Sequence, residues 1–431
     1  MGSQLLEMVQ THKSGVPVGI YAVCSAHPMV LEAAMTQARD EGTPVLIEAT
    51  SNQVDQYGGY SGMTPPMFRD LVHRIAAEQR LPIERVILGG DHLGPNRWRH
   101  LPASEAMLEA EGVVAAYVEA GYEKIHLDCS MACAGDTVPL SDDVVAERAA
   151  RLLAVAEEAS RRSGRAEPPV YVIGTEVPVP GGAHEELGEL VATTPEAAGS
   201  TLDAHRAAFE RAGVLDAWDR IIALVVQPGV EFDHLKVVQY DRSKTELLRH
   251  ALDDEPAMLF EAHSCDYQPA ARLRSLVEDH WFVIKVGPGV TFALREALFA
   301  LAAIEQELVP VERRSFFPDV VERVMLAKPA QWEKYYDGDY ESQRIARRYS
   351  YSDRLRYYLP DPEIAEAQEK LLSNLGATDI PLPLLSQYLP TQYQRVVEGA
   401  LTNDPRAIAM DRVRDALQPY VDACFPKETR N

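Results

Sequence analysis

Polar side chains recur at the ends of short apolar runs in this chain of 431 residues. Among these runs are VLIEAT, VILGGDH, KIHLDCS and AMLFEAHS. The residues at or near the ends of the runs are His27, Glu48, Asp91, His92, Asp128, Glu176, Gln227, His263 and Lys285. Imidazoles and carboxylates are suited to metal binding and to proton transfer, provided that the fold brings them together.

The apolar runs have the length and composition of buried β-strands. We predict strands over 18–27, 45–50, 86–92, 124–130, 170–177, 221–229, 257–264 and 282–288. Segments with helical spacing lie between them, such as 103–121, 141–161 and 194–212. Eight such units in roughly 250–290 residues favour a closed (β/α)₈ TIM barrel. The alternative is an open doubly wound sheet, but no GxGxxG follows the first run.

A barrel would gather all the polar strand ends on one rim. Taken singly, each of these residues could be a helix cap or a solvated loop residue. As a set they are costly to bury, and only mutual pairing, a metal or a ligand offsets that cost. We therefore predict a pocket at this rim.

The third run ends in Asp91 and His92, a pair that can offer an imidazole to a metal and a carboxylate to a substrate. With Glu176 and His263, His92 forms a predicted set of three metal ligands. Three protein ligands leave positions open for two sugar oxygens, as in catalytic zinc sites. We expect zinc, with manganese and magnesium as alternatives.

The remaining rim residues are predicted to bind substrate. The stretch KVGPG has two glycines whose amides can approach an anion where barrels often hold phosphate. Loops 51–66 and 178–186 carry glycines and are predicted lids. The predicted substrate contacts are His27, Asn52, Gln227, Lys285, Gly287, Gly289 and Arg354.

Composition restricts the partners of the chain. A formal net charge of -23 repels nucleic acid and anionic membrane surfaces. The five cysteines form no CxxC pair, which indicates reduced thiols and a cytoplasmic location. We find no signal peptide and no apolar run near the roughly 18 residues of a membrane span.

Beyond residue 300 the strand pattern gives way to helical spacing. We predict a barrel over 1–304 and a helical C-terminal extension over 305–431 that packs on it. The extension contains four arginines in QRIARRYSYSDRLRYY: Arg347, Arg348, Arg354 and Arg356. Surface ion pairing is the usual role of such a stripe, and we assign only Arg354 to the substrate.

Long motifs in the chain resemble those of the GatZ/KbaZ family. They include GGYSGMTP, GGDHLGP, KIHLDCSMACAGD, VIGTEVPVPGG, EAHSCDYQ and KVGPGVTFALREA, and the resemblance runs from about residue 5 to about residue 420. It implies either the non-catalytic subunit of a class II tagatose-bisphosphate aldolase or a tagatose-6-phosphate 4-epimerase acting on fructose 6-phosphate.

A more distant resemblance links the rim to catalytic class II aldolases, which bind zinc through three histidines. By position, Asp91 resembles their proton-transferring aspartate, and His92 and His263 resemble zinc ligands. Gln227 stands where a third histidine is expected, and Glu176 is the proposed substitute.

An aldolase-like rim can serve an epimerase. The C4 hydrogen of a 2-ketose is not adjacent to the carbonyl, so cleavage and re-formation of the C3–C4 bond is the route that inverts C4. We predict a metal-dependent 4-epimerase for fructose 6-phosphate and tagatose 6-phosphate, with Asp91, Glu48 or Asp128 as acid and base. The alternatives are a non-catalytic aldolase subunit and a true aldolase. Expected partners are a sugar phosphate, a class II aldolase catalytic subunit and other copies of the chain.

Overall fold

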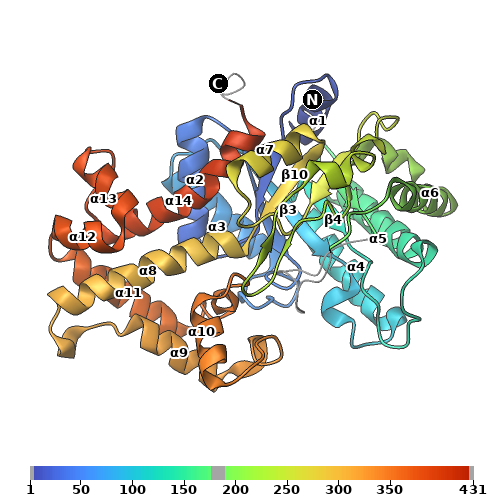
Figure 1. Ribbon diagram of the computed structural model, residues 1–431. Coiled ribbons are helices and arrows are strands. Elements are labelled where there is room, and N and C mark those ends of the chain that lie inside the picture. The colour runs from blue at the N-terminus through green and yellow to red at the C-terminus, as the bar shows by residue number, and fades with distance from the viewer. Residues whose placement is uncertain (1–3, 176–189, 427–431) are drawn as a thin grey trace.

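The centre of the protein is a closed barrel of eight parallel strands. It is seen in a computed structural model that describes residues 4–175 and 190–426 (Figure 1). The strands are β1 (Ile20–Val23), β2 (Val45–Thr50), β3 (Val86–Leu93), β4 (Lys124–Leu127), β5 (Val170–Ile173), β6 (Ile221–Val225), β9 (Leu259–Ala262) and β10 (Trp281–Val286). Pairing of β10 with β1 closes the barrel. The predicted TIM barrel is confirmed, and the open doubly wound alternative is wrong.

Helices surround the barrel because its strands are buried on both faces. They are α1 (Gln4–Lys13), α2 (Pro28–Glu41), α3 (Pro65–Glu78), α4 (Ala103–Glu119), α5 (Asp142–Ser163), α6 (Pro195–Arg211), α7 (Ala270–Glu278) and α8 (Pro288–Leu308). Local sequence sets their starts: α2 and α6 begin with proline, and the Ser141 side chain accepts a hydrogen bond from the Val144 N–H at the start of α5. The helices predicted over 103–121, 141–161 and 194–212 are thus confirmed as α4, α5 and α6.

Most strands are shorter than the apolar runs that predicted them. Glu48, Asp91, His92 and Lys285 lie within β-strands, whereas His27, Asp128, Gln227 and His263 follow the last residue of theirs. Pairing between strands stops where the loops diverge. The polar residues that follow the last paired residue nevertheless stay at the rim of the barrel. A small hairpin of β7 (Glu231–Phe232) and β8 (Val237–Val238) lies between β6 and β9.

The helical extension covers one side of the barrel (Figure 1). Its helices are α9 (Phe317–Ala327), α10 (Tyr340–Tyr349), α11 (Pro362–Gly376), α12 (Leu382–Tyr388), α13 (Pro390–Val397) and α14 (Pro405–Cys424). The last of these, α14, returns to the barrel and packs against α2, α7 and α8. The predicted division at residue 304 falls inside α8.

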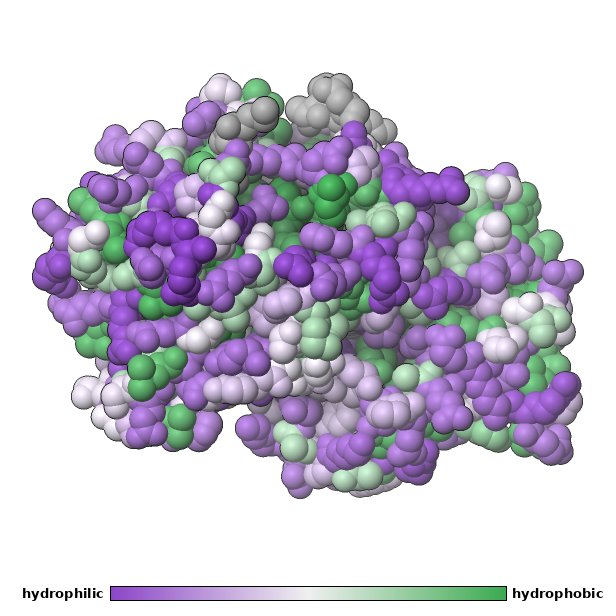
Figure 2. All heavy atoms as spheres, turned by 180° about the vertical axis from the view of Figure 1, so that it is seen from behind, coloured by the Kyte–Doolittle hydropathy of each residue, from purple (hydrophilic) through white to green (hydrophobic). Residues whose placement is uncertain are grey.

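Polar residues cover most of the face that Figure 2 shows, with hydrophobic residues in separate patches. Within the described ranges, no helix is both long and apolar enough to cross a membrane. All five cysteines are free thiols.

Candidate active site

A network of buried charges crosses the barrel interior. Lys124 Nζ lies 2.6 Å from Glu48 Oε1 and 2.7 Å from Glu261 Oε2. Lys285 Nζ lies 3.1 Å from Glu261 Oε1 and also pairs with Glu48. Gly89 makes room for this layer, because a Cβ there would meet the Glu48 side chain at 2.7 Å. The pairs offset part of the cost of burying these groups.

A β-bulge turns two adjacent side chains toward the same interior. The register of β3 against β4 shifts between Gly90 and Leu93, and His92 has a left-handed backbone with φ of 49°. A bulge breaks the alternation of side chains between the two faces of a strand. Asp91 and His92 therefore both contribute to the interior, with Asp91 Oδ2 3.7 Å from His92 Nε2.

Three imidazoles meet above the charge network. The ring centre of His263 lies 4.8 Å from that of His92 and 5.3 Å from that of His126. His92 Nδ1 donates to Asp128 at 2.7 Å, and His126 Nδ1 lies 2.9 Å from Asp91 Oδ1. We call His92, His126 and His263 the histidine cluster.

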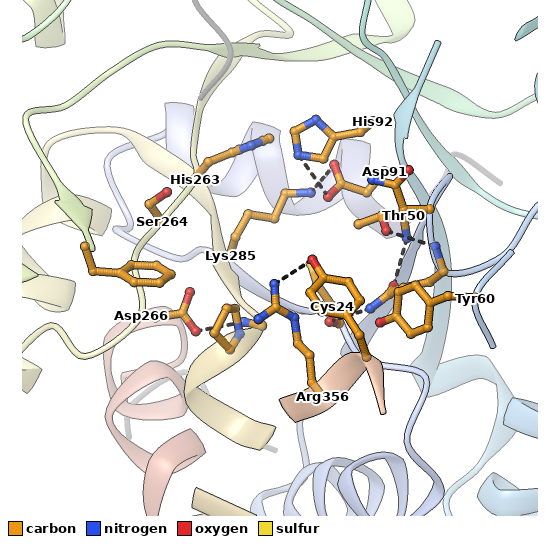
Figure 3. Close-up of a pocket in the computed structure, with 16 residues that line it drawn as sticks. Cys24, Thr50, Tyr60, Asp91, His92, His263, Ser264, Asp266, Lys285 and Arg356 are labelled. Atoms are coloured by element: carbon orange, nitrogen blue, oxygen red, sulfur yellow. Dashed lines mark hydrogen bonds and ion pairs between the residues drawn. The ribbon is translucent and has the colours of Figure 1, made fainter. Parts of the chain in front are cut away.

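Two rings of the histidine cluster, those of His92 and His263, line a pocket of about 80 Å³, which we call the central pocket, and the buried His126 lies outside the residues that line it. In Figure 3, His92, His263, Asp91 and Lys285 point toward one another above it. Lys285 Nζ lies 2.7 Å from Asp91 Oδ1, so its charge is shared among three carboxylates. The other side chains that face the pocket include Cys24, Asn52, Gln53, Tyr60, Phe232, Asp266, Arg356 and Tyr357.

Burial and neighbouring charges set the protonation of the site. Burial alone would raise the pKa of Asp91, but His92 and Lys285 lower it well below its usual value. Burial lowers the pKa of His263 to about 3, so this ring is neutral at physiological pH. Burial opposes a charge on His92 too, yet Asp91 and Asp128 outweigh it and raise its pKa. An ionised carboxylate thus stands beside a neutral imidazole.

The donor set fits a divalent cation. Ligand atoms of Asp91, His126, Glu261 and His263 all lie within 4.8 Å of one another. His126 Nε2 is buried and has no hydrogen-bond partner in the described part of the chain. In this part of the described chain four buried carboxylates, Glu48, Asp91, Asp128 and Glu261, exceed in number the two buried ammonium groups, Lys124 and Lys285. A proton on His92 offsets one of the two excess negative charges, and a divalent cation would offset both.

The predicted residues are placed as follows. Asp91, His92, His263 and Lys285 come together, whereas Glu48 and Asp128 lie behind them, fully buried and outside the residues that line the central pocket.

Other predicted residues do not join this group. Glu176, the predicted third ligand, and loop 178–186, a predicted lid, lie outside the described residues. Gln227 caps a turn, since its Oε1 accepts from the N–H groups of Gly229 and Val230. Asn52 lines the central pocket, and His27 lines a neighbouring one.

The predicted phosphate contacts differ most from expectation. The amides of Gly287 and Gly289 both donate to Asp266 Oδ1, at 2.9 and 2.7 Å. Among the arginines of the extension, Arg347 pairs with Glu322. Arg354 lines a separate pocket beside the central one, and Arg356 rather than Arg354 reaches the central pocket.

Comparison with known proteins places this site in a family. A family model described as D-tagatose-1,6-bisphosphate aldolase subunit GatZ/KbaZ-like matches residues 5–425. The chain belongs to this family. The resemblance predicted from the sequence motifs is therefore confirmed.

Solved structures include proteins that are similar to this chain over most of its length. The probable tagatose 6 phosphate kinase from Sinorhizobium meliloti 1021 is 49% identical, covers 94% of this chain and 100% of that chain, and gives a TM-score of 0.87. The fructose-bisphosphate aldolase from Campylobacter jejuni is 15% identical over 87% of this chain and 93% of that one, with a TM-score of 0.46. The YdjI aldolase from Escherichia coli K12 is 13% identical over 85% and 100%, with a TM-score of 0.44.

Two buried residues of the site in this GatZ/KbaZ-like protein, His126 and Glu261, are not among those predicted from the strand ends. Both lie two residues before a predicted site residue, His126 before Asp128 and Glu261 before His263. Side chains two apart along a strand share one face, so the period of two carried the signal.

Proposed function

We propose that this protein is a metal-dependent ketohexose-phosphate 4-epimerase that interconverts D-fructose 6-phosphate and D-tagatose 6-phosphate. The observation that supports this best is the histidine cluster with Asp91 beside it, because Asp91, His92 and His263 all line a single pocket. Such an array is costly to bury, and a subunit that only stabilises a partner gains nothing from it.

The donor set indicates where a cation would be held. Four residues place ligand atoms close together, and of these His126, Glu261 and His263 are the candidate ligands, because the carboxylate of Asp91 is needed for proton transfer. His92 contacts the rings of the two histidines. A divalent cation held there would withdraw charge from the sugar oxygens at C2 and C3.

The residues of the pocket supply the proton transfers. Asp91 takes the proton of the C4 hydroxyl, the C3–C4 bond breaks, and its electron pair passes to C3. The products are the enediolate of dihydroxyacetone and glyceraldehyde 3-phosphate. The aldehyde turns about its C4–C5 bond, C3 attacks the other face, and Asp91 returns the proton to the C4 oxygen.

Other residues hold Asp91 in place for this role. Lys285 and His126 contact one of its oxygens, so it stays ionised and oriented. Glu48 positions Lys285, and Asp128 fixes the His92 ring through Nδ1. We infer that Glu48 and Asp128 act through these neighbours rather than on the sugar.

The test is an assay of the purified chain with fructose 6-phosphate and zinc, manganese or magnesium. We expect tagatose 6-phosphate with at least one metal and no release of triose phosphate, which a coupled dehydrogenase detects. Released triose phosphate would indicate a true aldolase. ATP consumption with tagatose 6-phosphate is a separate measurement, because the similar Sinorhizobium protein is described as a probable kinase.

The second candidate is a supporting aldolase subunit, which the description of the family favours. The same preparation is added to a class II aldolase catalytic subunit, and its rate is compared with that of the subunit alone. A raised aldolase rate, together with no epimerisation under any metal, would replace the epimerase proposal with this one.

A further inference from the structure

The amides at the start of α8 leave no room for a second anion. The N–H groups of Gly287 and Gly289 both donate to the carboxylate of Asp266, a residue that is only 2% exposed. A phosphate at this point would meet a buried like charge at close range. The phosphate of a ligand therefore needs another cationic place near the central pocket.

The loop that carries Asp266 is fixed in this position. Ser264 and Tyr267 flank it with left-handed backbones, φ of 53° and 64°, which non-glycine residues adopt only where the surroundings impose it. The hydroxyl of Tyr420 also donates to the Cys265 carbonyl at 2.7 Å. Displacing Asp266 would break these contacts as well as its own two hydrogen bonds.

A second pocket, of about 420 Å³, lies where the barrel rim meets the helical extension. Four cations line it: Arg97 and Arg99 from the segment after β3, and Lys334 and Arg354 from the extension. No carboxylate is among its described lining residues. We call it the basic pocket, and it stands out in a chain whose net charge is -23.

The basic pocket adjoins the central pocket. Asn52, Tyr60 and Tyr357 line both. The rings of Tyr60 and Tyr357 contact each other edge to face, with centres 4.9 Å apart, and form part of the shared wall. A ligand that extends past this wall would place one end at the histidine cluster and the other among the cations.

Arg354 is the most buried cation of the basic pocket. It is 3% exposed, and its guanidinium carbon lies 3.5 Å from the ring centre of Tyr335 and 4.8 Å from that of Tyr357. Its Nε donates to the Gln331 carbonyl, and no carboxylate pairs with it in the described chain. Stacking between rings leaves the in-plane edge of an arginine to bind an oxyanion, and a buried cation without a counter-ion favours one.

Of the other three cations, two keep their charge available and one does not. Arg97 pairs with the fully buried Asp55, so its charge is compensated inside the protein. Arg99 and Lys334 are exposed and form no ion pair with described residues. Their ammonium and guanidinium groups can move onto a bound anion at little cost.

We propose that the basic pocket binds the phosphate group of the sugar phosphate, while the sugar carbons lie along Asn52, Tyr60 and Tyr357 toward the histidine cluster. This inference rests on the proposed function, because it takes a sugar phosphate as the ligand. It assigns the phosphate to the boundary between the barrel rim and the extension and the reacting carbons to the barrel interior, while the α8 amides stay bonded to Asp266.

Inorganic phosphate is the probe for the first test, by titration calorimetry on the full chain. The double variant Arg99→Met/Lys334→Met is expected to bind it about 10-fold more weakly or worse, because charge-assisted contacts are lost. The control Arg272→Met/Lys370→Met removes the same two charges from exposed positions outside this pocket, and its affinity is expected to stay within about 2-fold. Equal affinities for the two double variants would overturn the proposal.

Sugar preference is the second test. The ratio of kcat/KM for fructose 6-phosphate to that for free fructose is expected to fall about 10-fold in the pocket variant and not in the control. Arg354→Lys, which keeps the charge but loses the planar fork, is expected to lower the same ratio. An unchanged ratio in both pocket variants contradicts the assignment.

The two tests separate this proposal from the proposed function. Phosphate binding needs no turnover, so a chain without epimerase activity still reports whether the basic pocket holds phosphate. Normal epimerase activity with unchanged phosphate binding in the pocket variant would overturn only the phosphate assignment.

Discussion

Individual residues in the site have distinct roles although their types repeat. Asp91 faces the central pocket, whereas Glu48 and Asp128 are carboxylates without access to it. Asp266 is a third kind, since it accepts hydrogen bonds from two backbone amides. Burial raises its pKa to about 6, and those amides only partly oppose this. Position relative to the pocket, rather than residue type, separates the acid or base from its supports.

Asp91→Asn tests the assigned proton transfer. The amide cannot accept the C4 hydroxyl proton, so we expect turnover to fall by roughly 10²-fold or more, with fructose 6-phosphate binding largely retained. The measurement is steady-state turnover beside an equilibrium binding titration. Asp203→Asn, an exposed change on α6, is the control and should leave both unchanged. A near-normal rate in Asp91→Asn removes this residue from the role.

Among the elements, β3 contributes most to the site. Its glycines, bulge and terminal pair act together: Gly89 admits Glu48, and the shifted register turns Asp91 and His92 inward. The extension contributes in another way, because the short helix Arg354–Tyr357 lies at the pockets with two arginines and a tyrosine.

Gly89→Ala tests the fit between β2 and β3. A Cβ there would stand 2.7 Å from the Glu48 side chain, so that residue must move and its pairs with the two lysines must shift. We expect a loss of roughly 1–3 kcal/mol in the free energy of unfolding, measured by urea denaturation. Gly199→Ala on α6 is the matched control, because nothing lies within 4 Å of the new Cβ. It should stabilise the chain by roughly 0.5–1 kcal/mol, and an equal effect of the two changes would contradict the packing argument.

At the scale of the whole molecule, charge and burial couple stability to the solution. The excess negative charge of the site can be offset by a divalent cation from solution. The buried neutral histidines elsewhere can take up protons when the pH falls. Each gives a prediction that needs no assay of turnover.

Removal of divalent metal should lower the melting temperature. A cation bound only by the folded state stabilises it, and here it would also offset the excess negative charge. We expect dialysis against a chelator to lower the melting temperature and zinc or manganese to restore it. His126→Gln should weaken that restoration, whereas His73→Gln, an exposed change on α3, should not. If the chelator does not change the melting temperature, the assignment of a metal site to the histidine cluster is wrong.

Stability should fall as the pH is lowered through the range of histidine titration. Burial lowers the pKa of His12 and of His205 to about 4. The unfolded chain takes up these protons near pH 6.5 and the folded chain only near pH 4, so the unfolded state binds more protons between these values. His205→Gln should therefore lose less stability than the unaltered chain between pH 7.5 and 5.5, by roughly 1–1.5 kcal/mol in urea denaturation. Parallel curves for the two chains would show that His205 does not contribute.

The sequence by itself determined the barrel, its order of elements and four residues that meet at the rim. A strand that is buried on both faces consists of apolar residues, so its position can be predicted from the residues of that segment alone. For the same reason Asp91, His92, His263 and Lys285 were predictable at strand ends. Family membership also followed from long local motifs.

Only the tertiary structure decided which residues face the pocket and which ones support it. The bulge that turns His92 inward, the pairing of Lys124 with Glu261, and the capture of the α8 amides by Asp266 join residues far apart in the chain. The register between strands and the path of each loop set these contacts, and no short stretch of sequence encodes them. The same holds for the basic pocket, because its arginines and lysine come from the barrel rim and the extension and become neighbours only when the short helix Arg354–Tyr357 packs against α8.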